Sequence, residues 1–520
     1  MDRLPVEILD QIFRQFCRHC AAQPSSVECL PWYSWSASFF IFQRGHGRDT
    51  APLRALSLTS RAIRAVAQPI LYHELNLTTK HEGERPSSTL VLFLRTVLKN
   101  EYLAGMTQSI ISTRPLDVGL SHHWPIHDLI SEFFSSFDIS VGLARESENT
   151  WESARHRNLV VIYFTLCRAL DIAAKRACPA YGYPGKAILS HSLLAIVIGM
   201  LPNLSSLSFS EYVRTPDVYF SVFQSLNVSL SKLKQLSCTI TLGRAFDLVE
   251  VASNLEELHI HHLSEFHGMV PRLPKLRVLR ILRLQVPLLH CDVVERMVEA
   301  CEGGLREFTY YQHHTAEEFR AMRSNLAHMV SANSLYSITG STSEVVPAAW
   351  EDVPDLTQCL DKHKNSLTRL DLDVQQKQIH GSDISSLADY VHTDILTISP
   401  WYGNTWCLPP GNTKGLEWLL PCNLRVLRIR SPWPVPLWWP FMEKLLDLAE
   451  FLRSTNKSRL SSLESIECAM DLNIFWASRL DEVFSEVGIE FTLIDGFDSP
   501  NLGPPWAAQR VEAFHRGLYG

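Results

Sequence analysis

The residues best spaced for metal chemistry are Cys17 and Cys20, a Cys-x-x-Cys pair near the start of the chain. Two thiolates at this spacing bind zinc when further ligands follow as a second, regularly spaced pair. The nearest further candidates, Cys29 and His46, do not form such a pair. We therefore predict no metal site, and we expect Cys17 to belong to the apolar end of a helix and Cys20 to lie in a loop.

Motifs for catalysis and for phosphate binding do not occur in the sequence. It has no phosphate-binding loop, Gly-x-Gly-x-x-Gly turn, His-Glu-x-x-His pattern or Gly-x-Ser-x-Gly turn. Three histidine pairs, beginning at His122, His261 and His313, share no spacing with cysteines or carboxylates, and we expect them on the surface or in loops. We predict a protein that is not an enzyme and holds no cofactor. The alternative is a hydrolase or transferase with its site between residues 100 and 200.

Aromatic residues gather with prolines in two stretches that could bind a protein. Rigid aromatic side chains supply contact area at a small cost in conformational entropy, which suits a partner surface. The same residues could instead seal irregular turns, and the sequence leaves both readings open. The candidates for target binding are Trp401, Tyr402, Trp406, Trp433, Trp438 and Trp439.

The composition indicates a globular protein that binds neither nucleic acid nor a membrane. The 520 residues are 46% hydrophobic and 20% charged, with a formal net charge of -7, so no excess of basic residues is available for phosphates. The longest apolar run, Leu193 to Leu201, is shorter than the stretch of about 20 residues that crosses a bilayer. The 12 cysteines are scattered, and the opening residues lack a signal-peptide pattern. We therefore expect a location in the cytoplasm, the nucleus or both.

Two amphipathic helices must position the first part of the chain. In residues 4–16 the apolar side chains recur at helical spacing, and Pro5 suits a first turn. A second helical stretch covers residues 53–68; we expect Thr59 and Ser60 to break it, with Ser60 as a cap, and Pro69 to end it. Helices this short bury little apolar surface alone, so we expect them to need a partner.

These two stretches resemble the F-box, in particular that of fungal F-box proteins. The first reads Leu-Pro-x-Glu-Ile-Leu-x-x-Ile-Phe; the second contains Leu-Arg-Ala-Leu-Ser-Leu-Thr-Ser-Arg and ends in Pro-Ile-Leu-Tyr. The resemblance covers residues 3–18 and 51–75, in the family's order, with an insertion at about 18–50 between the halves. Ile63 stands where many members have tryptophan.

The resemblance implies binding to the Skp-type adaptor of cullin-RING ubiquitin ligases. In the family, the Leu-Pro turn and the apolar helix faces make this contact. An alternative for the same residues is that they only attach the helices to the rest of the chain. The positions that match the family's contacts are Leu4, Pro5, Ile8, Leu9, Ile12, Phe13, Leu56 and Leu58.

The remaining residues carry a degenerate repeat, Leu-x-x-Leu-x-apolar. First leucines of neighbouring copies lie 21 residues apart at Leu255 and Leu276, and 39 apart at Leu424 and Leu463. The pattern is typical of leucine-rich repeats, in which each copy supplies a short strand to a solenoid. The alternative, a doubly wound α/β domain, would need glycine turns for phosphate, which the sequence lacks. Copies begin at Leu204, Leu233, Leu255, Leu276, Leu305, Leu335, Leu367, Leu396, Leu424 and Leu463.

These observations predict an α/β protein: an N-terminal helical F-box at 1–75, then an irregular leucine-rich-repeat solenoid. Residues 76–200 hold irregular first repeats and helices, 201–495 the regular array, and 496–520 a cap or tail. F-box proteins with such repeats bind a target on the repeats, so the resemblance implies a substrate receptor of a Skp-cullin-F-box ubiquitin ligase. A scaffold that binds the adaptor outside ubiquitin ligation is the alternative.

Overall fold

The structure is a computed structural model. The residues that it describes are 4–17, 20, 51–77, 86–112, 184–209, 223, 228–240, 247–263, 269–284, 291–312, 359–373, 387–398, 416–430, 439–455, 459–469 and 474–493.

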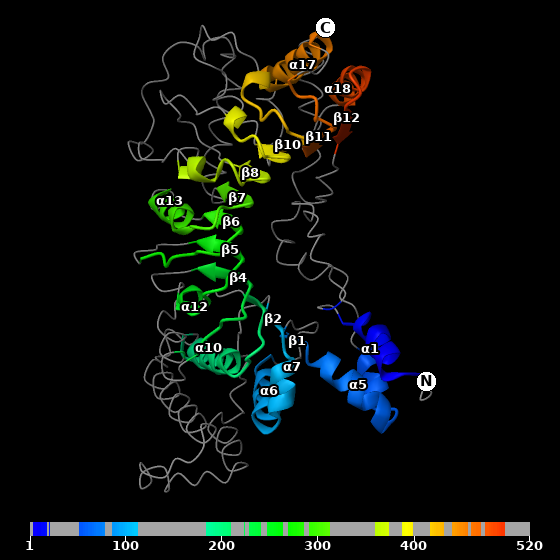
Figure 1. The fold of residues 1–520 in the computed structure, drawn as a ribbon, viewed down its shortest axis with the longest axis vertical. Helices are drawn as coiled ribbons and strands as arrows, with labels where there is room; N and C mark the ends of the chain where they lie inside the picture. Colours follow the sequence, from blue (N-terminus) through cyan, green and yellow to red (C-terminus); the bar gives the residue numbers. More distant parts are fainter. Residues whose placement is uncertain are drawn as a thin grey trace, which may run out of the picture.

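Twelve strands of the described residues form one open parallel sheet, in which every strand pairs with the next one along the chain. This order, with helices between strands, confirms the predicted α/β class (Figure 1). The strands are β1 (Glu74–Asn76), β2 (Ser109–Ser112), β3 (Ser206–Phe209), β4 (Gln235–Ile240), β5 (Glu257–Leu263), β6 (Val278–Leu284), β7 (Glu307–Gln312), β8 (Arg369–Asp373), β9 (Ile395–Ile398), β10 (Val426–Arg430), β11 (Ser465–Ala469) and β12 (Glu490–Leu493).

A repeated hydrogen bond pattern sets the register from strand to strand. The carbonyl oxygen just before a strand accepts two backbone N–H groups from the next one. The Lys234 carbonyl accepts from Glu256 N at 2.8 Å and Glu257 N at 2.9 Å, and the Glu256 carbonyl accepts from Arg277 N and Val278 N. The pattern satisfies the polar backbone where each strand enters the sheet.

The core lies between the sheet and the helices that cover one of its faces. Leu258 and Ile260 of β5 are fully buried, while His259 between them points to the other face, as strand alternation requires. Cys238 and Cys468 occupy the same inward positions in β4 and β11 and are also buried.

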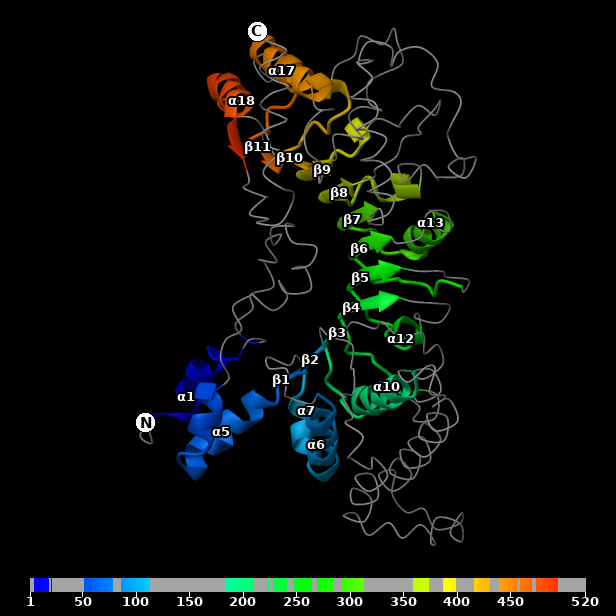
Figure 2. The same ribbon diagram turned by 180° about the vertical axis from the view of Figure 1, so that it is seen from behind.

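Helices α10, α12 and α13 lie along the outer side of the curved sheet in both views of the ribbon (Figures 1 and 2). Short 3-10 turns lie before β8, β9 and β10. Among the described residues, the helical elements after β1 are α6 (Pro86–Lys99), α7 (Glu101–Met106), α10 (Pro184–Gly199), α12 (Asp247–Glu250), α13 (Cys291–Ala300), η4 (Asp361–His363), η5 (Leu387–Asp389), η6 (Leu416–Trp418), α17 (Trp439–Ser454) and α18 (Ile474–Glu486).

The N-terminal helices are α1 (Val6–Arg14), α4 (Ala51–Ser57) and α5 (Arg61–Leu71), and they form a core separate from that of the sheet. Ser60 caps α5 as predicted, because its Oγ accepts a hydrogen bond from Ile63 N at 3.2 Å. The prediction that Pro69 ends this helix is wrong. Proline lacks one N–H, and a helix within a turn of its end loses little by that, so α5 continues to Leu71.

Strands lie at nine of the ten predicted repeat copies, from Leu204 to Leu463. The tenth copy, at Leu335, lies outside the described residues, and β7 pairs directly with β8. Strand β2 was not predicted, because Thr107 stands where the pattern expects leucine. Thr107 is fully buried, and its hydroxyl donates to the Leu103 carbonyl at 3.3 Å, so the polar group is satisfied inside the core.

Candidate functional site

Exposed apolar residues lie on α1 and directly before it, and we call them the apolar stripe of α1: Leu4, Ile8 and Ile12. Ile8 and Ile12 are one turn apart on the helix, and Leu4 lies just before its N-cap residue, Pro5. Their exposed fractions are 42%, 41% and 39%. Pro5, the N-cap residue of α1, is exposed as well. Four of the residues that the F-box resemblance assigns to adaptor binding are thus accessible to a partner.

The inner side of α1 packs on the other N-terminal helices. Leu9 and Phe13 are buried against Leu53 of α4 and Ile63 of α5. Leu56 is half-buried and packs against the same cluster. Truncating such a buried phenylalanine to alanine costs about 3–5 kcal/mol. These residues therefore stabilise the helices, whichever partner binds the outer side.

Exposed apolar side chains are concentrated in the N-terminal helices. Of the ten large apolar residues that are exposed in the described part of the chain, five lie within the first 58 residues. Single exposed residues of this kind are ordinary, whereas a concentration of them is typical of an interaction surface. The five are Leu4, Val6, Ile8, Ile12 and Leu58, and Leu58 is the most exposed at 76%.

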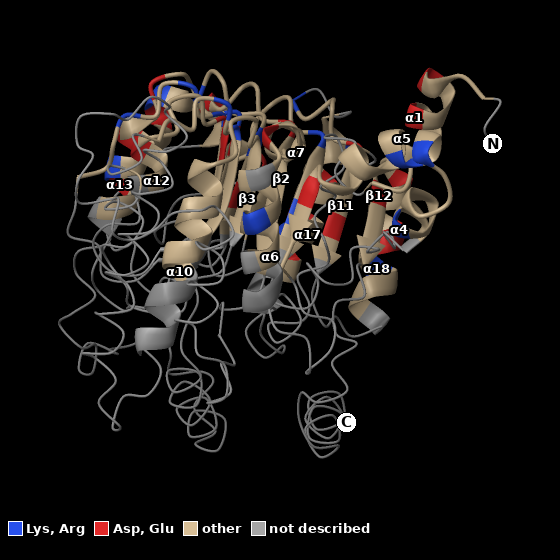
Figure 3. Ribbon diagram, turned by 90° about the horizontal axis from the view of Figure 1, so that it is seen from below, with Lys and Arg blue, Asp and Glu red and all other residues tan. Residues whose placement is uncertain are grey.

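The sheet face that points away from the helices carries a row of mostly polar side chains, one from the middle of each strand. Across β6 to β11 we call these residues the central row. Acidic and basic positions are interspersed on the sheet (Figure 3). By strand register, the central row is Arg280, Thr309, Asp371, Thr397, Arg428 and Glu467.

Ion pairs neutralise the charges of the central row. Arg280 lies 2.7 Å from Glu307 on β7, and Arg428 lies 2.6 Å from Glu467 on β11. Because the charges are paired between neighbouring strands, this face carries little unbalanced charge.

Asp371 is the buried centre of the row. Its side chain is 1% exposed and accepts from Arg369 Nε at 2.8 Å. Thr309 Oγ1 donates to Asp371 Oδ2 at 3.2 Å, and Thr397 Oγ1 donates to the other carboxylate oxygen. One carboxylate thereby connects β7, β8 and β9.

The aromatic residues proposed for target binding are not located by the structure. Trp439 begins α17, but nothing is described of its side chain. The other five lie outside the described residues: Trp401, Tyr402, Trp406, Trp433 and Trp438.

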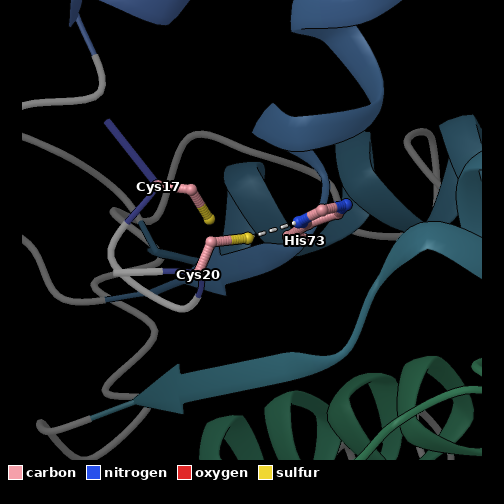
Figure 4. A group of neighbouring side chains, drawn as sticks. All are labelled: Cys17, Cys20 and His73. Carbon is pink, nitrogen blue, oxygen red and sulfur yellow. Dashed lines mark hydrogen bonds between the residues drawn. The ribbon is translucent and has the colours of Figure 1, made fainter. Parts of the chain in front are cut away.

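Three side chains with metal-binding atoms meet where the N-terminal helices join the sheet. Cys17 is buried three residues beyond α1, Cys20 is half-buried, and His73 directly precedes β1. The three point toward one another, and Cys20 Sγ lies 3.1 Å from His73 Nδ1 (Figure 4). Sequence spacing missed this group, because His73 follows Cys20 by 53 residues. The prediction that Cys20 lies in a loop is wrong, because Cys20 has a helical backbone and packs on the N-terminal core.

The environment of Cys20 favours the neutral thiol. A hydrogen bond with the Cys17 thiol and then burial raise the pKa of Cys20 well above its ordinary value. Arg14 lowers that pKa, and Asp10, its salt-bridge partner at 2.6 Å, raises it. A thiol held neutral is a poor nucleophile, so this group does not resemble an activated catalytic cysteine.

A polar groove lies at the edge where β8 to β11 begin. Its volume is about 620 Å³, and Asp394, Arg425 and Glu464 are among its lining residues. Arg425 and Glu464 form an exposed ion pair at 3.4 Å. The lining also includes Ser366, Ser462 and His392, and the Ser366 hydroxyl donates to the Leu305 carbonyl at 2.7 Å.

Comparison with protein-family models gave no match for the chain, and comparison with curated proteins gave none. Within the described ranges, no helix has the length and apolarity needed to cross a membrane.

Proposed function

We propose that the chain is the substrate-recognition subunit of a Skp-cullin-F-box type ubiquitin ligase. In this proposal the N-terminal helices are an F-box, the sheet and its helices are a leucine-rich-repeat solenoid, and the protein catalyses no reaction itself. The observation that carries the proposal is the apolar stripe of α1, which occupies positions that resemble the adaptor contacts of F-boxes and is exposed. The receptor acts by proximity, since it raises the concentration of a bound target near the ubiquitin-charged enzyme.

The two surfaces differ in chemistry, and we assign adaptor binding to the N-terminal helices and target binding to the sheet. The helices offer apolar side chains, as a stable subunit contact needs, while the partly exposed ion pairs of Arg280 with Glu307 and Arg428 with Glu467 offer paired charges for a protein target. The N-terminal helices precede β1 directly, so a target on the strands is held in a defined position relative to the adaptor.

Adaptor binding is tested by calorimetric titration of a purified Skp-family adaptor into the full chain. Changing Ile8 and Ile12 to alanine removes apolar surface that the adaptor would cover. At about 25 cal/mol per Å² this should weaken binding about tenfold or more. The matched control is Leu92→Ala, which removes a leucine 60% exposed on α6 and should leave the affinity unchanged. If the wild-type chain does not bind the adaptor, the proposal is wrong; equal binding by all three proteins refutes the assignment of α1.

Whether a ligase is assembled is a separate question from adaptor binding. Purification of the tagged chain from cells should recover a cullin together with the adaptor, and the Ile8→Ala/Ile12→Ala variant should lose both. Recovery of the adaptor without a cullin would favour the scaffold that acts outside ubiquitin ligation.

Target binding by the aromatic residues is tested by proximity labelling in cells with the wild-type chain and with Trp438→Ala/Trp439→Ala. The variant should lose a subset of the labelled neighbours, whereas an unchanged set would assign these residues to packing.

A further inference from the structure

The metal-binding atoms of Cys17, Cys20 and His73 all lie within 4.8 Å of one another. Zinc bonds of about 2.3 Å to sulfur and 2.0–2.1 Å to nitrogen place neighbouring ligand atoms of a tetrahedral ion roughly 3.5–3.8 Å apart. Shifts of up to about 1 Å would bring the three atoms to this spacing. We propose that Cys17, Cys20 and His73 bind one zinc ion that joins the N-terminal helices to the first strand of the sheet.

The donor set favours zinc over harder cations. Two thiolates and one imidazole suit zinc, whereas calcium and magnesium prefer carboxylate, carbonyl and water oxygens. Three protein ligands leave one corner of the tetrahedron, which a water molecule would occupy. Phe16, Leu56 and Leu71 pack against the same small core as Cys20, and the charges of Arg14 and Asp10 also act on Cys20.

The backbone holds the ligands in place before any ion binds. The His73 carbonyl accepts from Gln108 N at 2.9 Å and Ser109 N at 3.0 Å, and His73 N donates to the Ile70 carbonyl. His73 is 4% exposed, so its ring has little freedom. Cys17 is 3% exposed, and its N–H donates to the Arg14 carbonyl at 3.1 Å. Ligands held in this way lose little conformational entropy when the ion binds.

Zinc binding would create a cross-link between distant parts of the chain. Cys17 and Cys20 follow α1, whereas His73 is linked by backbone hydrogen bonds to the start of β2. An ion bound only by the folded state stabilises that state in proportion to the logarithm of its concentration over the dissociation constant. The site would therefore stiffen the junction between helices and sheet, and it would form with or without an adaptor.

The test uses the full chain, reduced and stripped of metal with a chelator, to which zinc chloride is returned in equilibrium dialysis. We expect one tightly bound zinc ion per chain and a rise in the thermal midpoint. Cobalt chloride should give a sulfur-to-cobalt charge-transfer band and the strong visible absorption of a tetrahedral site. Cys20→Ser and His73→Gln should each weaken zinc binding at least about a hundredfold, since even second-shell changes at zinc sites cost 10–100-fold.

The matched control is Cys422→Ser, another partly exposed cysteine remote from the three ligands, which should bind zinc like the wild type. Far-ultraviolet circular dichroism of each metal-free variant establishes that it is folded. The proposal is overturned if the folded wild type binds no zinc, or if Cys20→Ser binds it as well as wild type does. It is also overturned if bound cobalt shows no thiolate band, which would indicate adventitious binding to other histidines.

Discussion

The ion pair of Asp371 and Arg369 should dominate the stability of the central part of the sheet. In Asp371→Ala, the guanidinium of Arg369 keeps its charge in a position where its side chain is only 13% exposed. Thr309 and Thr397 also lose the acceptor of their hydroxyl groups. Removing one partner of a buried pair destabilises a protein by about 3–5 kcal/mol, and we expect this value for the free energy of unfolding.

The assay is urea unfolding at 25 °C, followed by circular dichroism, of Asp371→Ala, Arg369→Ala and the double variant. Because the double variant leaves no uncompensated charge, its loss should be at least about 2 kcal/mol smaller than the sum of the single losses. The control is Arg479→Ala, which breaks an ion pair whose side chains are 52% and 63% exposed and should cost less than about 1 kcal/mol. A loss below about 1 kcal/mol for Asp371→Ala, or additive losses, would refute the reasoning.

Three further predictions concern the core. Leu258→Ala should lower the free energy of unfolding by about 2–5 kcal/mol in the same urea assay, because Leu258 is fully buried. The control is Met269→Ala, which should change this free energy by less than about 0.5 kcal/mol, because the Met269 side chain is 92% exposed. Burial lowers the pKa of His191 from 6.5 to about 4, so the neutral imidazole makes its full contribution to the free energy of unfolding above pH 6.5. This free energy should fall by about 3 kcal/mol as the pH drops to 4, because the unfolded chain then binds a proton at His191 more readily than the folded chain does. His191→Leu should remove this component from the pH dependence of the unfolding midpoint. Burial, partly offset by the charge of Lys362, raises the pKa of Cys301 to about 12. Iodoacetamide at pH 8 should therefore modify Cys301 at least about a hundredfold more slowly than the partly exposed Cys422, as measured by mass spectrometry of the peptides. Unfolding the chain in urea should abolish this difference in rate.

Most strands of the sheet could be predicted from the sequence, because inward positions of neighbouring strands form one continuous core and must all be apolar. Cysteine satisfies this requirement at positions 238 and 468. Strand β2 escaped prediction, since Thr107 enters the core only by bonding its hydroxyl to the preceding helix. A pattern of leucines cannot identify a core position that is occupied by a threonine whose hydroxyl is hydrogen-bonded to a nearby carbonyl.

The candidate sites were predictable only in part. Helical spacing groups Ile8, Leu9, Ile12 and Phe13 on one broad face, but which half of it packs on α5 depends on tertiary contacts. The proximity of His73 to Cys17 and Cys20 likewise depends on how α5 leads into β1. Cys20 and His73 are 53 positions apart, so no local sequence pattern indicates that folding brings them together.

The strictly sequential order of the strands gives the molecule a built-in length scale. Neighbouring strands are about 4.8 Å apart, so the steps from β1 to β12 follow an arc of about 50 Å. The chain between β7 and β8 shows that extra residues can be accommodated between two paired strands without changing their register. Adding or deleting one whole strand, in contrast, would move everything beyond it by one step relative to the N-terminal helices. The number of strands would thus set the distance between a partner bound at the helices and a partner bound on the strands. A change in that number would alter the distance without altering either contact surface.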